Sequence, residues 1–189
     1  MTVDALPSRE QALALLHEWV QNPNLRKHCY AVEAVMRAYA RHYGEDEERW
    51  GLTGLIHDFD WERHPDAERH PMKGVEVLRA AGWPEDVCRA VLGHATYSGV
   101  PRDTRMAQAL FACDELAGFL VACALVTPGR SLDEVEVASV RKKMKRPDFA
   151  RNVNREDILQ GTAELGEDLD AHIAFTLNAM KAVRGELGL

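Results

Sequence analysis

The sequence predicts an all-α protein, a helical bundle with a C-terminal helical extension. Two observations support this fold class. Segments with apolar residues at helical spacing follow one another along the chain, and capping residues, glycine or proline bound each of them. No segment shows the alternating β-branched pattern of a strand, and no Asn-Gly or Asp-Gly pair marks a hairpin. We therefore expect helices throughout.

The first helices are defined by capping signals. Ser8 and Gln11 form a capping box that begins a helix ending near Val20. Asn24 can cap a second helix over residues 25–43, after which glycine provides a stop.

Proline marks two of the next three predicted helices. A third helix should cover residues 45–58. Pro71 and Pro84 are suited to the first turn of a helix, so they predict a fourth over 71–82 and a fifth over 84–95.

The second half of the chain continues in the same way. We expect a long apolar helix over 103–126 with Asp103 as its cap, then further helix within 131–146. A capped helix over 155–165 and a last one over 169–184 complete the chain.

The turn "VTPGRS" near residue 128 is the one plausible internal boundary. It divides a helical core, residues 1–127, from a helical extension, residues 131–189. Because no flexible linker separates them, we predict that residues 1–189 form a single domain.

Composition narrows the classes of partner and compartment. A net charge of −7 disfavours a nucleic-acid polymer as the main partner, because such proteins usually present a basic surface. The N-terminal stretch lacks a signal-peptide layout, and the most apolar segment carries an Asp and a Glu in its interior. We expect a cytoplasmic protein outside the membrane, with four reduced core cysteines; an oligomer is compatible with the sequence.

Several polar residues are predicted to point inward. His28 shares a helical stripe with apolar residues four, seven and eleven positions later, and His94 and Asp114 occupy similar stripes. His57 and Asp58 end an otherwise apolar segment. One buried histidine can be an ordinary core residue, and one buried Asp can cap a helix. The whole set is better explained by a divalent cation, because a buried carboxylate is costly without a partner.

This pattern resembles the HD superfamily of metal-dependent phosphohydrolases, which is all-helical. The superfamily combines an adjacent His-Asp pair with an upstream His and a downstream Asp, matched here by His28, His57, Asp58 and Asp114 within residues 24–127.

Two further segments resemble dinuclear HD proteins, including the HD-GYP phosphodiesterases. These are "HPMKG", which begins at His70, and "GHATYSGVP", which begins at His94. The resemblance implies one or two divalent transition metal ions (Mn, Fe, Co, Ni or Zn), with Asp58 bridging. The implied ligands are His28, His57, Asp58, His70, His94 and Asp114.

The resemblance implies hydrolysis of a small phosphorylated substrate by metal-activated water. The catalytic candidates are Asp58, Asp60 and Glu62, the last two as groups that orient imidazoles or move a proton. The pair continues "FDW", whereas HD-GYP proteins continue with Ile-Gly-Lys.

An anionic substrate requires positive charge near the metals. The candidate substrate-binding residues are Arg26, Lys27, Lys73, Arg102, Lys142 and Lys145. The alternative for the "RKKMKR" run is a solvated helix C-terminus favoured by the helix dipole.

Two other functions use the same residues. HD-type di-iron oxygenases have the same ligand set, and a non-catalytic HD signalling or binding module would keep the fold.

Overall fold

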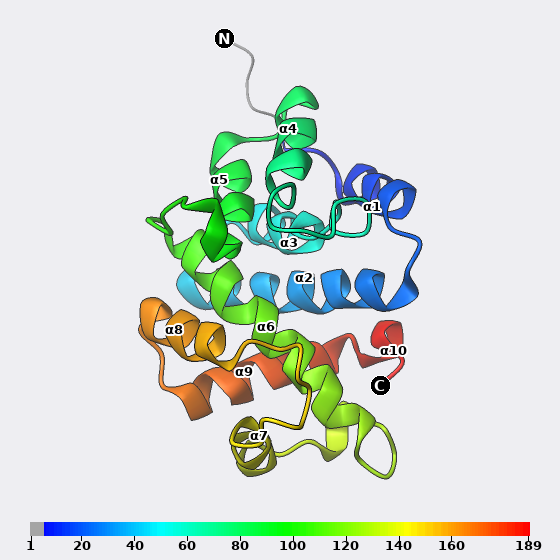
Figure 1. Cartoon of the computed structure of the whole chain (residues 1–189), viewed down its shortest axis with the longest axis vertical. Helices are drawn as coiled ribbons and strands as arrows, with labels where there is room; N and C mark the ends of the chain where they lie inside the picture. Colours follow the sequence, from blue (N-terminus) through cyan, green and yellow to red (C-terminus); the bar gives the residue numbers. More distant parts are fainter. Residues whose placement is uncertain (1–5) are drawn as a thin grey trace.

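The computed structural model describes residues 6–189, and this part of the chain is helical with no strand (Figure 1). The first five residues, which belong to the stretch considered for an export signal, lie outside the described range. The helices are α1 (Arg9–Trp19), α2 (Pro23–Tyr43), α3 (Glu47–Ile56), α4 (Met72–Ala80), α5 (Glu85–His94), α6 (Arg105–Leu125), α7 (Val137–Met144), α8 (Arg155–Leu165), α9 (Leu169–Ala182) and α10 (Arg184–Leu187), with short 3-10 turns η1 (Thr96–Ser98) and η2 (Leu132–Glu134). The predicted fold class is confirmed.

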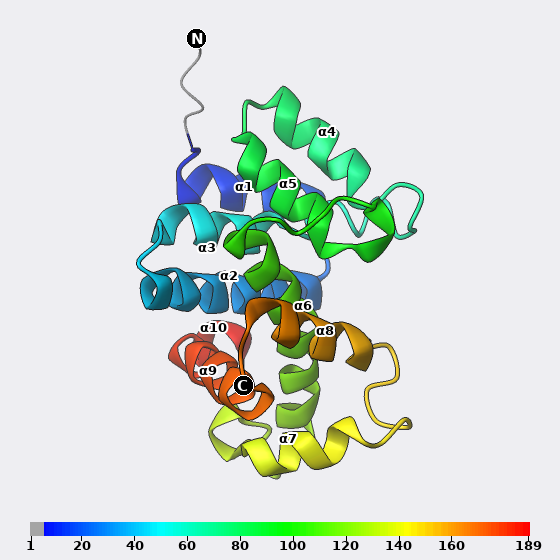
Figure 2. The same ribbon diagram turned by 90° about the vertical axis from the view of Figure 1, so that its left-hand side faces the viewer.

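Helix α2 crosses the middle of the molecule. Figures 1 and 2 show α1, α3, α4 and α5 on one side of it and α7 to α10 on the other. Helix α6 runs through both halves and packs against α2, α5 and α8. Because α2 and α6 are the long central helices, side chains on their facing surfaces lie in the interior.

The helix ends mostly follow the predicted signals. Ser8 and Gln11 form the expected capping box. The prediction of the α2 cap was wrong, because the cap is Asn22, two residues earlier, and Pro23 occupies the first helical turn. Likewise Thr104 caps α6.

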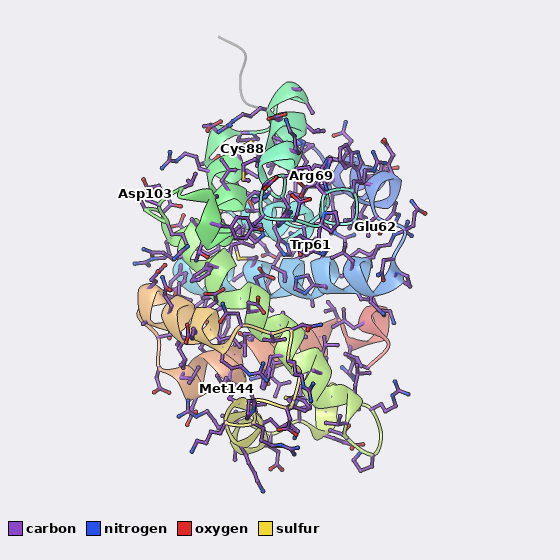
Figure 3. The ribbon with its side chains drawn as sticks, viewed as in Figure 1. Trp61, Glu62, Arg69, Cys88, Asp103 and Met144 are labelled. Atoms are coloured by element: carbon purple, nitrogen blue, oxygen red, sulfur yellow. The ribbon has the colours of Figure 1, made fainter. Side chains whose placement is uncertain are left out.

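Asp103, the expected cap of α6, instead forms an exposed ion pair with Arg89 at 3.0 Å. It lies on the loop at the left of Figure 3.

Helix α6 is the one helix among residues 6–189 with the length and hydropathy to cross a membrane, and 61% of its apolar stretch is buried inside the protein. Its Cys113 and Cys123, like Cys29 and Cys88, are buried free thiols. As expected from its internal Asp and Glu, α6 is the central core helix.

Two glycines allow backbones to come close around the core. A Cβ at Gly54 would lie 2.9 Å from the carbonyl oxygen of Val32, so α3 packs tightly on α2. A Cβ at Gly161 would lie 2.6 Å from the Cα of Ala112, which brings α8 against α6. The first contact draws the end of α3 toward α2.

Candidate metal centre

Four predicted ligands from three helices form a first donor group. His28 comes from α2, His57 and Asp58 follow the last turn of α3, and Asp114 comes from α6. The Nε2 atom of His28 lies 2.9 Å from Oδ1 of Asp114 and 3.2 Å from Nε2 of His57. Oδ2 of Asp58 lies 3.5 Å from Nε2 of His57.

The other two predicted histidines form a second donor group with Asp58. His70 precedes α4 and His94 is the last residue of α5. Their Nε2 atoms are 3.2 Å apart, and they lie 3.4 and 3.3 Å from Oδ1 of Asp58. One oxygen of Asp58 therefore faces each group.

Hydrogen bonds on the far side of three rings fix which nitrogen faces the centre. Nδ1 of His57 lies 2.8 Å from a backbone carbonyl oxygen, and Nδ1 of His94 also contacts one. Nδ1 of His70 lies 2.8 Å from Oδ1 of Asp60. Because these oxygens only accept, each Nδ1 donates, and each neutral ring presents an unprotonated Nε2.

This arrangement of donors fits a transition metal. The Nε2 atoms of His70 and His94 face one another across 3.2 Å, so their lone pairs would repel unless a proton or a metal ion lies between them. Imidazole nitrogen with carboxylate oxygen suits Mn, Fe, Co, Ni and Zn. Each of the two groups could hold an ion, because the donor atoms within a group all lie within 4.8 Å of one another.

The electrostatics of the cluster also favour a cation. Burial alone would lower the pKa of His57, but the carboxylates of Asp58 and Asp114 outweigh it and raise that pKa to about 9. Burial opposes ionisation of Asp58 and Asp114, yet the neighbouring imidazoles hold the pKa of both below the usual range. Without a metal ion the cluster therefore favours binding a proton, and a metal ion that binds there would displace that proton.

A cavity of about 320 Å³ opens onto both donor groups. Aromatic side chains line part of it: Trp61, Tyr97 and Phe111. The ring of Trp61 stands edge-to-face on His70, with centroids 4.9 Å apart. Figure 3 shows Trp61 near the middle of the molecule.

Two acids in this cavity were missed by the sequence reasoning. Glu115 follows Asp114 on α6, and Asp157 comes from the first turn of α8. Burial, reinforced by the charge of Asp114, raises the pKa of Glu115 to about 7; burial also raises that of Asp157. The Glu115 position next to a ligand was a usable signal, whereas nothing in the sequence places α8 beside the centre.

Asp60 takes the orienting role rather than a place in the cavity. It is fully buried, with Oδ1 bonded to His70 and Oδ2 accepting from the backbone N–H of Gly74 at 2.8 Å. Of the two roles expected for Asp60, orienting an imidazole or moving a proton, its contact with His70 fits the first, and the ring of His70 separates Asp60 from the centre.

The expectation that Glu62 orients an imidazole or moves a proton is corrected. Its Oε2 accepts from the backbone N–H groups of Gln21 and Asn22, at 2.8 and 2.9 Å. In Figure 3 it lies toward α1, away from Trp61. Glu62 therefore anchors the connection between α1 and α2.

Three of the expected substrate-binding cations are engaged elsewhere. Arg26 donates to the carbonyl oxygen of Val20 at 2.7 Å. Lys73 pairs with Glu76, and Arg102 forms a two-pronged pair with Glu164 at 2.6 and 2.7 Å. Each has a structural partner instead of a place in the cavity.

The remaining three cations differ in position. Lys142 and Lys145 are exposed on or just after α7 and do not line the cavity at the donor groups, so their expected role there is corrected. Lys27 lines a second cavity that adjoins the centre at His28.

Comparison with known proteins places this centre in a family. The model of the HD domain matches residues 25–118, which include all six donor residues. No curated protein and no solved structure matches the chain. The match and the His/Asp cluster together show that residues 25–118 form an HD domain, a family whose members are mostly metal-dependent hydrolases.

Proposed function

We propose that this protein is a metal-dependent phosphohydrolase with a dinuclear centre. The observation that supports it is the position of Asp58, whose Oδ1 lies 3.3 and 3.4 Å from one pair of histidines while its Oδ2 faces the other donor group. A carboxylate in this position could bridge two ions, and paired ions would stabilise the attacking and leaving oxygens of an in-line displacement at phosphorus.

The chain's own residues would divide the work as follows. His28, His57 and Asp114 would hold one ion, and His70 and His94 would hold the other. When bound, such ions lower the pKa of water and stabilise negative charge on phosphoryl oxygens. Trp61 and Tyr97 line the cavity and give it an aromatic wall.

Hydrolysis also requires a proton for the leaving group. Water adds to phosphorus, the P–O bond to the leaving alcohol breaks, and the alcohol oxygen takes up a proton. Glu115 and Asp157 are the carboxyl groups that line the cavity without belonging to a donor group. They are the candidates for proton donation.

The test is a screen of phosphomonoesters, phosphodiesters and nucleotides with protein reconstituted separately with Mn, Fe, Co, Ni and Zn. Asp58→Ala is the blank, because it removes the bridging carboxylate, and Lys142→Gln is the surface control. We expect hydrolysis by the wild type and the control, and none by the blank.

Two results would contradict the proposal. Equal activity of the blank and the wild type would show that the centre is not the active site. A mixed-valent iron EPR signal in anaerobically purified protein that hydrolyses none of the phosphoesters would instead support a di-iron oxygenase.

A further inference from the structure

The cavity at the donor groups has no positive side chain of its own. Among residues 6–189, no Lys or Arg lines it, while Glu115 and Asp157 add negative charge to that of the ligands. The positive charge to attract an anionic group there would therefore have to come from metals held by the donor groups. Any second anionic group of a substrate would be repelled from this cavity.

A larger cavity, of about 920 Å³, has the opposite character. It lies between the N-terminal part of α2, the C-terminal half of α6 and α10, which Figures 1 and 2 show beside one another. Lys27, Arg130 and Arg184 line it, together with apolar side chains including Val121 and Leu187. No Asp or Glu side chain of the described residues lines it.

Two of these cations are available to a ligand. Lys27 and Arg130 form no side-chain hydrogen bond or ion pair within residues 6–189, whereas Arg184 pairs with Asp133 at 3.2 Å. In a protein with a net charge of −7, a cavity lined by three cations and by no Asp or Glu side chain of the described residues is suited to an anion.

The two cavities adjoin at the metal centre. His28 and Gly118 line both of them. Gly118 stands within α6, one turn after Asp114, and a Cβ built on it would meet no atom within 4 Å. A glycine inside a helix costs about 1 kcal/mol relative to alanine, and no packing contact requires a glycine at this position. The absence of a side chain at Gly118 leaves open space where the two cavities adjoin.

We propose that the substrate is an elongated phosphoester with a second anionic group. Its reacting phosphoryl group binds at the metals, an apolar segment passes over Gly118, and the distal anion binds Lys27 and Arg130. This inference rests on the proposed phosphohydrolase function and specifies its substrate class. The distal group is a phosphate or a carboxylate, and the cations recognise the charge common to both.

The experiment measures binding, so it does not depend on turnover. The full chain loaded with Mn²⁺ is titrated calorimetrically with an alkane bisphosphonate and with the alkyl monophosphonate of the same chain length. We expect the bisphosphonate to bind at least about tenfold more tightly, because a charge-assisted contact is worth about that factor. A matching carboxyalkyl phosphonate reports whether the distal site accepts both anions.

The variants test both the open space at Gly118 and the positive charge of Lys27 and Arg130. Lys27→Gln with Arg130→Gln should reduce the affinity ratio toward one, and so should Gly118→Leu, whose side chain fills the open space. Lys142→Gln, which removes an exposed cation on α7, should retain the ratio. Thermal melting confirms that each variant is folded.

The outcomes separate the two proposals. A ratio near one in the wild type, or a ratio that survives the double substitution, overturns the elongated substrate even if short phosphoesters are hydrolysed. A clear preference without hydrolysis of any phosphoester upholds the distal anion site and overturns the phosphohydrolase proposal.

Discussion

The carboxylate of Asp60 accepts a hydrogen bond from Nδ1 of His70 at 2.8 Å, and this contact directs Nε2 of His70 toward Asp58. The same carboxylate accepts from the backbone N–H of Gly74, so its position is fixed from the start of α4. The second donor group therefore depends on a residue that lies outside it.

Replacing Asp60 should weaken metal binding at one donor group only. Asp60→Asn presents an amide N–H to one of the two N–H donors, so His70 loses its fixed orientation, and affinity for the second ion should fall about 10- to 100-fold. Metal titration should then show one tight ion per chain. Asp66→Asn, in a half-exposed acid of the same loop, should leave both ions. Loss of both ions from Asp60→Asn would mean that the two donor groups do not act separately.

Substitution of Gly74 should reduce metal binding as much as substitution of Asp60 does. A Cβ there would lie 2.6 Å from Cγ of Asp60, so Gly74→Ala must displace the buried carboxylate. We expect the same loss of the second ion, measured by elemental analysis of the purified protein. In the matched helical variant Gly118→Ala the Cβ meets nothing, and its melting temperature should stay the same or rise. Full metal content in Gly74→Ala would show that Asp60 does not position His70.

Glu62 provides a test of an anchoring contact against a catalytic one. Glu62→Ala removes the acceptor for two backbone N–H groups, and we expect it to lower the free energy of unfolding by about 1 kcal/mol. Denaturant titration measures this change. The kcat on any accepted phosphoester should stay within about twofold, since the side chain lies outside the cavity. A large fall in kcat with unchanged stability would restore Glu62 to the active site.

His172 should make stability depend on pH. It is buried, and its Nδ1 accepts from the Tyr39 hydroxyl at 2.6 Å while Nε2 donates to the carbonyl oxygen of Ala112 at 2.9 Å. Burial lowers its pKa below 6.5, so below that pH the unfolded chain binds a proton that the folded protein does not. The free energy of unfolding therefore falls as the pH drops below 6.5 toward the folded pKa, and is unaffected by His172 above that window.

The matched variant isolates this effect. His172→Gln lacks the titrating ring, so the stability difference between wild type and variant should shrink from about pH 7.5 to about pH 5.5. All other titratable groups are common to both proteins, so their contributions cancel in the difference. A difference that is constant across this range would contradict the assignment.

Three of the donor residues could be predicted from the sequence because they break a pattern. His28, His94 and Asp114 are polar residues on apolar helical stripes, and each would be costly to bury without a common partner. The helices were predictable for a similar reason, since caps, glycines and prolines act locally. The cap of α2 was misplaced because Asn22 and Asn24 flank Pro23, and both are competent caps.

The substrate-facing residues were harder to predict, because their environment depends on contacts distant in sequence. In the sequence Arg102 has no evident partner, whereas in the structure it pairs with Glu164, which lies 62 residues later. Asp157 reaches the metal centre only because α8 packs on α6. A run of cations such as that around Lys142 shows that the segment is positively charged, but it does not show how far the segment lies from the metal centre.

Anomalous scattering from a crystal of the Mn²⁺-loaded protein would locate the two metal ions that we propose Asp58 to bridge. We expect two anomalous peaks, one next to each carboxylate oxygen of Asp58, with His28, His57 and Asp114 around the first and His70 and His94 around the second. A single peak, or two peaks that do not contact Asp58, would contradict this proposal.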